Sequence, residues 1–478
     1  MASAHEEVEG WPRARLRALA QTICDPSALH GLLEQGRGAS RETVRDILFE
    51  SERGRGLTPE QTAVLLCVKD PELRAQVKAT AAGVHERLFA RRVRLSDPFC
   101  PTNRCLSDCT YCPLRRSNAR LRRHVFTVRD LQRELTLLLE EGYRHLTLVF
   151  GEDKGGMPYV ADMLAAACGA SAGIRRVQRL DVNLNASRPE ELKVLAAADR
   201  LGTYHVYQET YDPETYGRLH PDGCKADYEW RITSHDRACE TGIRDLGLGV
   251  LLGLYDARFD VLAVLSHARY LLETYEPEAL TISYPRLLPA PEAPGSLDQR
   301  WAVGDEEFVF LVAVTRLAMP FVEIVLNTPA PSAVRRELYG AGVSQVAVGS
   351  LTYPGVYTAD GEPSAGGSLR IGRPRNLERL VYRMCEVGFV PNFSTDRYPR
   401  VRRKTGEDPE EELSAAHRAA ANSLLALHEY LLDQAAPATR DLLVGTIQEE
   451  LGRLPKRVQD QTLSLMEEAE AGLRGGRL

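Results

Sequence analysis

The sequence predicts an α/β protein, a (β/α)8 TIM-type barrel with helical extensions at both ends. Eight short apolar runs, rich in Val, Leu, Ile and Tyr, alternate with segments of helical periodicity between about residues 97 and 349. This alternation is typical of βα units around a parallel sheet, and eight units in about 250 residues match the size of a complete barrel. This alternation of strand-like and helical segments is missing before residue 96 and after about residue 350.

Residues 1–95 are expected to form a helical N-terminal extension without strands. Ser40 precedes the amphipathic run RETVRDILFES. Thr58 and Pro59 provide an N-cap residue followed by proline at the first helical position. The segment ELRAQVKATAAGVHERLF continues at helical spacing up to residue 89.

Residues 96–350 are expected to form the barrel. The strand-like runs are 97–101, 145–150, 179–185, 203–208, 245–251, 279–284, 321–326 and 344–349. Between the first two runs, Thr127 is placed to cap the helix LQRELTLLLEE, which Gly142 ends. Because a short apolar run can also belong to a buried helix, the barrel prediction depends on the regular repetition of the unit.

Residues 351–478 are expected to form a mostly helical C-terminal segment. A Gly/Pro-rich stretch over 349–374 ends the barrel pattern, and a helix follows at about 376–387. An irregular stretch and the charged run GEDPEEE (406–412) then lead into helices separated by Pro437 and Pro455.

The composition is that of an ordinary soluble globular protein, with 44% hydrophobic and 26% charged residues in a chain of 478. The formal net charge of −6 argues against DNA or another polyanion as the main partner. No apolar run is long enough to span a membrane. The N-terminus MASAHEEVEG lacks the basic and apolar stretches of a secretory signal. We therefore expect a cytoplasmic protein with neither nucleic acid nor membrane as its partner.

Four of the ten cysteines lie within thirteen positions: Cys100, Cys105, Cys109 and Cys112. The last three form a C-x3-C-x2-C motif directly after the first strand-like run, where barrels of this class place their catalytic residues. Three thiolates on one loop can bind three irons of a 4Fe-4S cluster and leave the fourth iron open. A structural zinc site with Cys100 as the fourth ligand is the alternative, although the spacing is not a standard zinc spacing.

The motif, with Tyr111 before its last cysteine, resembles the signature of radical S-adenosylmethionine (SAM) enzymes. The resemblance implies that the open iron binds the amino and carboxylate groups of SAM, and that one electron releases a 5′-deoxyadenosyl radical. Gly151 and Glu152, directly after the second strand-like run, resemble the Gly-Glu element that binds the SAM ammonium in that family. Without that context, Glu152 would be an ordinary solvated acid in a loop.

Further stretches resemble the aromatic amino-acid lyase branch, which includes the tyrosine lyase of hydrogenase maturation and the thiamine-pathway 2-iminoacetate synthase. They are CTYCPLRRSN, TYHVYQETYDPETYGRLHP, KADYEWR, GLGVLLGLYDARFDVLAVLSHARYL, TISYPRL and VSQVAVGS, and the resemblance covers about residues 40–435. It implies that Glu209 and Arg231 bind the ribose and carboxylate of SAM. Alternatively, Glu209 is an acid at a strand end and Arg231 a surface residue paired with Asp227 or Glu229.

Two features depart from this branch. The hydrogenase maturase carries a second, C-terminal cluster on a C-x2-C pair, but Ser394 and Arg397 stand at those positions here. Cys385 is the only cysteine beyond residue 240, so we expect a single 4Fe-4S cluster. After the seventh strand, the branch has a Ser-Thr-Arg-Glu stretch whose arginine helps to bind the substrate carboxylate, whereas this chain has Pro329 in place of that arginine.

Arg286, in the TISYPRL stretch, is then the nearest arginine of the pattern that could bind a substrate carboxylate, as a catalytic-site residue. The alternative is that Arg286 pairs with an acid of a neighbouring loop and braces the barrel rim.

The predicted function is abstraction of hydrogen from an aromatic amino acid or a derivative, leading to Cα–Cβ or Cα–carboxylate bond cleavage. One alternative is a diverged enzyme acting on a carboxylate-blocked substrate in natural-product biosynthesis. Another is a non-catalytic scaffold or electron-transfer paralogue that keeps the cluster. A basic patch predicts docking of an acidic electron donor such as flavodoxin or ferredoxin, although a solvated loop explains it equally well: Arg115, Arg116, Arg120, Arg122 and Arg123.

Overall fold

The computed structural model describes residues 8–152, 156–287, 299–327, 330–348, 377–397 and 409–478. Parallel strands form a closed ring in which the last strand pairs with the first. These strands are β1 (Arg92–Thr102), β2 (His145–Phe150), β5 (Arg179–Asn183), β6 (Leu201–His205), β7 (Asp245–Gly249), β8 (Ala279–Ser283), β9 (Glu323–Leu326) and β10 (Gln345–Ala347). The predicted (β/α)8 barrel is therefore confirmed, and each of these strands overlaps its expected run.

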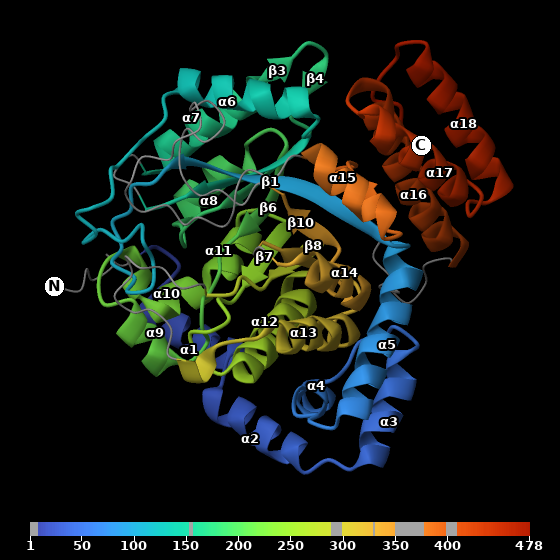
Figure 1. Cartoon of the computed structure of the whole chain (residues 1–478). Helices are drawn as coiled ribbons and strands as arrows, with labels where there is room; N and C mark the ends of the chain where they lie inside the picture. The colour runs from blue at the N-terminus through green and yellow to red at the C-terminus, as the bar shows by residue number, and fades with distance from the viewer. Residues whose placement is uncertain (1–7, 153–155, 288–298, 328–329, 349–376, 398–408) are drawn as a thin grey trace.

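Helices follow the strands and surround the ring (Figure 1). They are α6 (Val128–Glu141), α7 (Gly156–Gly169), α8 (Pro189–Ala196), α9 (Pro213–Leu219), α10 (Tyr228–Ile232), α11 (Ser234–Glu240), α12 (Ala257–Tyr275), α13 (Asp305–Ala318) and α14 (Ser332–Ala341), with a small hairpin of β3 (Ser171–Ala172) and β4 (Arg175–Arg176). Helix α6 begins and ends as its sequence predicts, because Thr127 forms a capping box with Asp130 and Gly142 takes a left-handed conformation.

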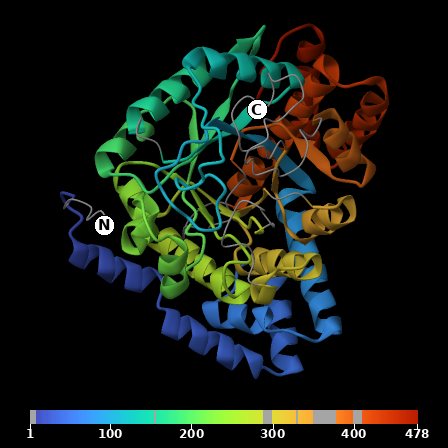
Figure 2. The ribbon, with the colours of Figure 1, turned by 60° about the vertical axis from the view of Figure 1, so that its left-hand side comes forward.

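The N-terminal helices lie along one side of the barrel, as the blue segments of Figures 1 and 2 show. They are α1 (Arg13–Ile23), α2 (Pro26–Arg37), α3 (Arg41–Ser51), α4 (Pro59–Leu66) and α5 (Pro71–Phe89), and α5 packs against α13 and α14. The expectation that no strand precedes residue 96 needs correction. Strand β1 begins at Arg92, and its first residues alternate buried arginines with Val93, a pattern without the apolar run that marks most strands.

The C-terminal helices follow the barrel, the first drawn in orange and the other three in red in Figure 1. They are α15 (Leu377–Glu386), α16 (Pro409–Asp433), α17 (Pro437–Leu451) and α18 (Lys456–Glu470). A short strand that the sequence did not predict, β11 (Val390–Asn392), pairs with the first residues of β1. The Gly/Pro-rich stretch at 349–374 lies outside the described residues. None of the helices described here has the length and apolar character needed to cross a membrane.

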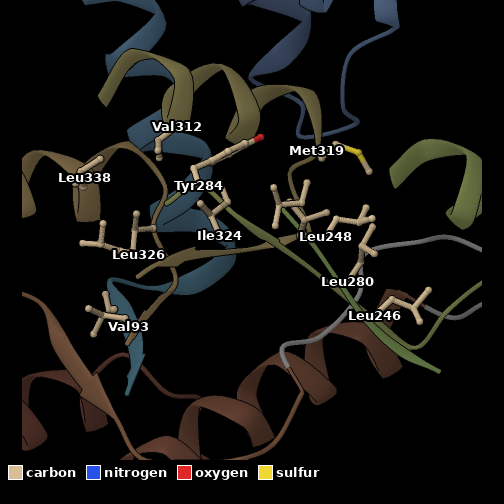
Figure 3. Packing of buried hydrophobic residues seen from close by; sticks show 14 of the residues in the cluster. Val93, Leu246, Leu248, Leu280, Tyr284, Val312, Met319, Ile324, Leu326 and Leu338 are labelled. Atoms are coloured by element: carbon tan, nitrogen blue, oxygen red, sulfur yellow. The ribbon is translucent and has the colours of Figure 1, made fainter. Parts of the chain in front are cut away.

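The hydrophobic core lies between the strands and the helices. Figure 3 shows leucines of β7 and β8, together with Ile324 and Leu326 of β9, gathered beside the surrounding helices. Leu246, Leu280 and Ile324 are buried, and each such side chain contributes about 1.5–3 kcal/mol on burial. Because this outer layer supplies the apolar packing, the interior of the barrel is free to hold polar side chains.

The N-terminal end of the barrel is filled by paired charges, which we call the basal ion-pair layer: Arg94, Arg179, Asp181, Asp245 and Glu323. Arg94 Nη1 lies 2.7 Å from Glu323 Oε2, and Arg179 bridges Asp181 at 2.9 Å and Asp245 at 3.0 Å. Arg397, one of the positions where the sequence lacks a cluster cysteine, adds a contact of 3.0 Å to Asp245. Buried charges of this kind persist only when they are paired, so the layer closes this end of the barrel.

Candidate active site

A cavity of about 320 Å³ opens at the C-terminal ends of the barrel strands. All the residues that the sequence singled out for a site line it: Cys105, Cys109, Tyr111, Cys112, Gly151, Glu152, Glu209, Arg231 and Arg286. They come from the segments after four different strands, β1, β2, β6 and β8, as is usual for the catalytic face of a barrel. Cys100 lines the same cavity from within β1.

The cysteine loop, residues 103–124, is held in place by hydrogen bonds to its own backbone. Arg123 donates from Nη1 to the carbonyl oxygens of Asn103 and Leu114, at 2.7 and 2.8 Å, and from Nη2 to the carbonyl oxygen of Arg115. At the other side, the backbone N–H of Thr110 donates to the carbonyl oxygen of Leu219 at 3.0 Å. The loop therefore has a fixed shape before any ligand binds.

Burial raises the pKa of each motif thiol, that of Cys112 to about 11, and the charges of neighbouring cysteines add to the shift at Cys109 and Cys112. Binding a metal to them must therefore displace protons. Within the described part of the chain, no three His, Cys, Asp or Glu side chains are grouped tightly enough for a single metal ion. A 4Fe-4S cluster takes its cysteine ligands on separate irons, which places those ligands further apart.

Gly151 and Glu152 bring the loop after β2 into contact with the cysteine loop. A Cβ on Gly151 would lie 2.1 Å from the carbonyl oxygen of Arg104, so only glycine allows this approach. The N–H of Leu106 donates to the carbonyl oxygen of Glu152 at 2.6 Å, and the Ser107 hydroxyl donates to Glu152 Oε2. Glu152 Oε1 is buried without a hydrogen-bond partner among the described residues. This oxygen is therefore available to a cationic ligand.

Glu209 faces two cations across the cavity. Its Oε1 lies 2.6 Å from Lys225 Nζ and 3.9 Å from Arg231 Nη2. Burial alone would lower the pKa of Lys225, but the charge of Glu209 helps to raise it above its ordinary value. Glu209 also has a left-handed backbone (φ 71°), a conformation that costs about 1–3 kcal/mol and occurs mainly at functional sites.

Arg231 is 3% exposed and donates to the carbonyl oxygen of Tyr207 at 2.7 Å and to Asn185 Oδ1 at 2.6 Å. The surface pairing with Asp227 or Glu229 considered from the sequence does not occur in this arrangement. Asp227 pairs with Arg13 instead, at 2.5 Å.

Tyr111 is nearly buried and is tied to a histidine. Its hydroxyl lies 2.9 Å from His220 Nε2, while His220 Nδ1 lies 2.8 Å from the carbonyl oxygen of Tyr216. Burial and the charge of Lys225 hold the pKa of His220 well below its ordinary value, so the ring is neutral. Nδ1–H therefore donates to the carbonyl, and Nε2 accepts from Tyr111.

Arg286 lines the cavity mouth but is already paired. Its Nη1 lies 2.6 Å from Asp305 Oδ1, and its guanidinium lies over the Phe308 ring at 4.7 Å. Asp305 begins α13, so this geometry has the form of the rim-bracing alternative considered from the sequence. Binding a substrate carboxylate would require Arg286 to share or leave Asp305. Pro329 lies outside the described residues.

The basic patch is divided by the structure. Arg116, Arg120 and Arg122 are exposed, and Arg116 Nη2 lies 2.5 Å from Asp222. Arg115 and Arg123 are half-buried, and Arg123 is committed to the carbonyls of the cysteine loop. The exposed cations of the loop therefore face outward, while Arg123 maintains its shape.

The residues present fit a 4Fe-4S cluster with SAM on three observations. Three thiols line one cavity, Glu152 Oε1 is an unpaired buried acceptor suited to an ammonium, and Gly151 lets the loop that carries Glu152 approach the cysteine loop closely. Lys225 and Arg231 add the cations that a carboxylate requires.

Lys225, Ser107 and His220 take part in this site although sequence reasoning did not single them out. Lys225 could have been identified from the sequence, because it belongs to the KADYEWR stretch that also contains Arg231. The contacts of Ser107 and His220 depend on how the cysteine loop folds against the loop at 219–225, and no spacing in the sequence shows this.

The chain is similar to known proteins over most of its length. A family model described as the radical SAM superfamily matches residues 99–264, and one described as the biotin and thiamin synthesis associated domain matches residues 283–390. The 2-iminoacetate synthase of Escherichia coli strain K12 is 33% identical over 357 residues, which cover 74% of this chain and 85% of that protein.

Solved structures are similar over almost the whole chain. The structure of HydG, described as a maturase of the [FeFe]-hydrogenase, has a TM-score of 0.85 at 30% identity and covers 95% of this chain and 99% of its own. The HydG of Carboxydothermus hydrogenoformans has a TM-score of 0.80 at 26% identity, over 94% and 99% of the two chains.

Proposed function

Because the chain belongs to the radical SAM superfamily, in the family of the 2-iminoacetate synthases, we propose that it acts on an aromatic amino acid or a derivative of one. The reaction begins with hydrogen abstraction by a 5′-deoxyadenosyl radical and leads to cleavage of the Cα–Cβ or the Cα–carboxylate bond. When bound, the reduced cluster supplies the electron that generates this radical from SAM.

The observation that carries the proposal is the convergence of the three motif thiols with Glu152 Oε1 on one cavity. In this proposal Cys105, Cys109 and Cys112 hold the cluster, Glu152 binds the SAM ammonium, and Arg231 binds its carboxylate. Glu209 is placed for the ribose, and Tyr111 lines the cofactor site from the cysteine loop. Lys225 holds Glu209 in position.

We further propose a single cluster per chain. The position that would hold a second cysteine pair contains Ser394, which is nearly buried, and Arg397, which is paired with Asp245. Neither side chain is a ligand that iron–sulfur clusters use.

We assign Arg286 to the binding of the substrate carboxylate. In this role Arg286 would leave Asp305 and pair with the substrate. If Arg286 stays paired with Asp305, a substrate whose carboxylate is blocked becomes a better candidate than one with a free carboxylate. For the electron donor we propose an acidic protein of the flavodoxin or ferredoxin kind, which would meet the exposed cations Arg116, Arg120 and Arg122 of the cysteine loop.

The experiment that tests the function is anaerobic reconstitution with iron and sulfide, followed by reduction with dithionite in the presence of SAM. We expect about four irons per chain. We also expect 5′-deoxyadenosine, formed faster when L-tyrosine or L-tryptophan is added, with a cleaved fragment detected by mass spectrometry. A loaded protein that forms no 5′-deoxyadenosine would favour the scaffold alternative.

The Glu152→Gln variant should keep its cluster and bind SAM about ten- to hundredfold more weakly. The amide cannot offer the charged acceptor that an ammonium prefers, and a hydrogen bond to a charged group is worth roughly 1.5–3 kcal/mol. The measurement is the SAM dissociation constant of reconstituted protein, with iron content determined on the same sample. An unchanged dissociation constant would remove Glu152 from the SAM site.

A further inference from the structure

The deep end of the cavity is polar. Barrels of this class usually fill their interior with branched apolar side chains. Here hydrogen-bonding side chains line the part of the cavity above the basal ion-pair layer, and we call them the polar floor: Ser96, Thr147, Asn183, His205, Tyr207, Asn327 and Gln345. A purely apolar ligand would leave such groups facing it without partners.

Several members of the polar floor bind one another. Gln345 Nε2 donates to Ser96 Oγ at 3.0 Å, across the junction of β10 and β1. The Tyr207 hydroxyl donates to Ser283 Oγ at 3.0 Å and accepts from Asn327 Nδ2 at 3.2 Å. These contacts fix the walls of the floor around its centre.

His205 is different, because it is 3% exposed and its Nδ1 is buried without a hydrogen-bond partner among the described residues. Its Nε2 lies 3.7 Å from Asp181 Oδ2, which is too long for a hydrogen bond. Asp181 is already engaged by His145 Nε2 at 2.7 Å and Arg179 Nε at 2.9 Å. Leaving a buried polar group unpaired costs about 1–3 kcal/mol, so the imidazole is suited to a partner that enters the cavity.

Strand β7 is built to accommodate this ring. A Cβ on Gly247 would lie 1.9 Å from His205 Nδ1, and a Cβ on Gly249 would lie 2.6 Å from Tyr207 Cδ1. Any larger residue at these two inward positions would displace the rings. The two glycines therefore leave room for the rings of His205 and Tyr207 inside the barrel.

Charge is distributed unevenly along the cavity. The acids and cations, Glu152, Glu209, Lys225, Arg231 and Arg286, lie at the mouth, whereas the floor offers neutral amides, hydroxyls and an imidazole. An amino acid would place its charged amino and carboxylate groups at the mouth. Its side chain would then extend down to the floor.

We propose that His205 is a specificity-determining residue, which hydrogen-bonds to a polar group carried at the far end of the substrate's aromatic ring. This inference rests on the proposed function, since it takes the substrate to be an aromatic amino acid or a derivative. The imidazole can donate from one nitrogen and accept at the other, which suits a ring hydroxyl. A site that pairs a buried polar group with a substrate hydroxyl strongly rejects the analogue that lacks it.

The test compares 4-methylphenol with toluene, which differ only in the hydroxyl group, as ligands of the full-length, anaerobically reconstituted protein. Dissociation constants are measured by ligand-observed NMR titration. The native protein should bind 4-methylphenol at least about tenfold more tightly than toluene. His205→Phe should lose this preference, and His205→Gln, which keeps a hydrogen-bonding group, should retain part of it. A preference that survives in His205→Phe, or is missing in the native protein, overturns the inference.

Two controls separate this role from folding and from the proposed function. Val206→Ala truncates a buried neighbour of His205 that does not line the cavity, and it should keep the preference. His205→Leu replaces His205→Phe if the latter does not fold, as judged by thermal unfolding. Formation of 5′-deoxyadenosine by the native protein is measured in parallel. If the native protein forms 5′-deoxyadenosine but does not prefer 4-methylphenol, only the inference about His205 is wrong. If it shows a preference that depends on His205 but forms no 5′-deoxyadenosine, only the proposed function is wrong.

Discussion

Replacing Cys109 with alanine is expected to abolish both the iron–sulfur cluster and SAM cleavage. Cys109 is 4% exposed, lies between the other two motif cysteines in the sequence and lines the same cavity. With two thiolates left, the loop cannot hold three corners of a 4Fe-4S cluster. Iron content, absorption near 400 nm and 5′-deoxyadenosine formation after reconstitution measure the effect.

The matched control is Cys385→Ala, which removes a half-buried cysteine on α15, far from the cysteine loop in the sequence and outside the cavity lining. Iron content and SAM cleavage should both be preserved in this variant. Near-full activity of Cys109→Ala would end the assignment of the motif as the cluster site.

Replacing Gly151 with alanine should reduce SAM binding by more than about a hundredfold and impair cluster loading. The new Cβ would lie 2.1 Å from the Arg104 carbonyl oxygen and 3.4 Å from Cys105 Cβ, so the two loops must separate. That separation would also break the hydrogen bond from Leu106 N–H to the Glu152 carbonyl oxygen. The separation would misplace both Glu152 and Cys105. Because two cofactor contacts would then be disturbed, we expect a larger loss of affinity than from a single lost contact.

The control for Gly151→Ala is Gly169→Ala, at the end of α7, where an added Cβ meets nothing within 4 Å. Both variants are compared by SAM dissociation constant and iron content. Native-like values for Gly151→Ala would show that the close approach of the two loops is not needed for cofactor binding.

The sequence predicted the barrel well because its strands are short apolar runs separated by regular helices. Strand β8, expected at 279–284, covers Ala279–Ser283, and β2 has its expected bounds. The start of strand β1 was missed because its first residues include Arg92 and Arg94. Arg94 pairs with Glu323, and Arg92 donates a hydrogen bond to the carbonyl oxygen of Phe89. A local pattern cannot show that a charged residue will meet its partner from a strand more than two hundred positions away.

Candidate site residues were found where they belong to a local motif. Cys105, Cys109 and Cys112 share one loop, and Gly151 with Glu152 follows a recognisable strand. His205 and Lys225 were not singled out, because their significance depends on neighbours from other strands, such as Gly247 beside the imidazole and Glu209 beside the ammonium. The roles assigned to the cofactor residues and to Arg286 are predictions, of which the variants above test those of Cys109, Gly151 and Glu152.

The basal ion-pair layer has a consequence for the order of events in catalysis. The cavity lining reaches Ser96, His205 and Gln345 but none of the paired charges beneath them, so the described residues form a well with its opening at the cysteine loop. In the proposed function, SAM binds beside the cysteine loop, at the opening of this well. We therefore expect ordered binding, in which the substrate enters before SAM and the product fragment on the polar floor leaves after the spent cofactor.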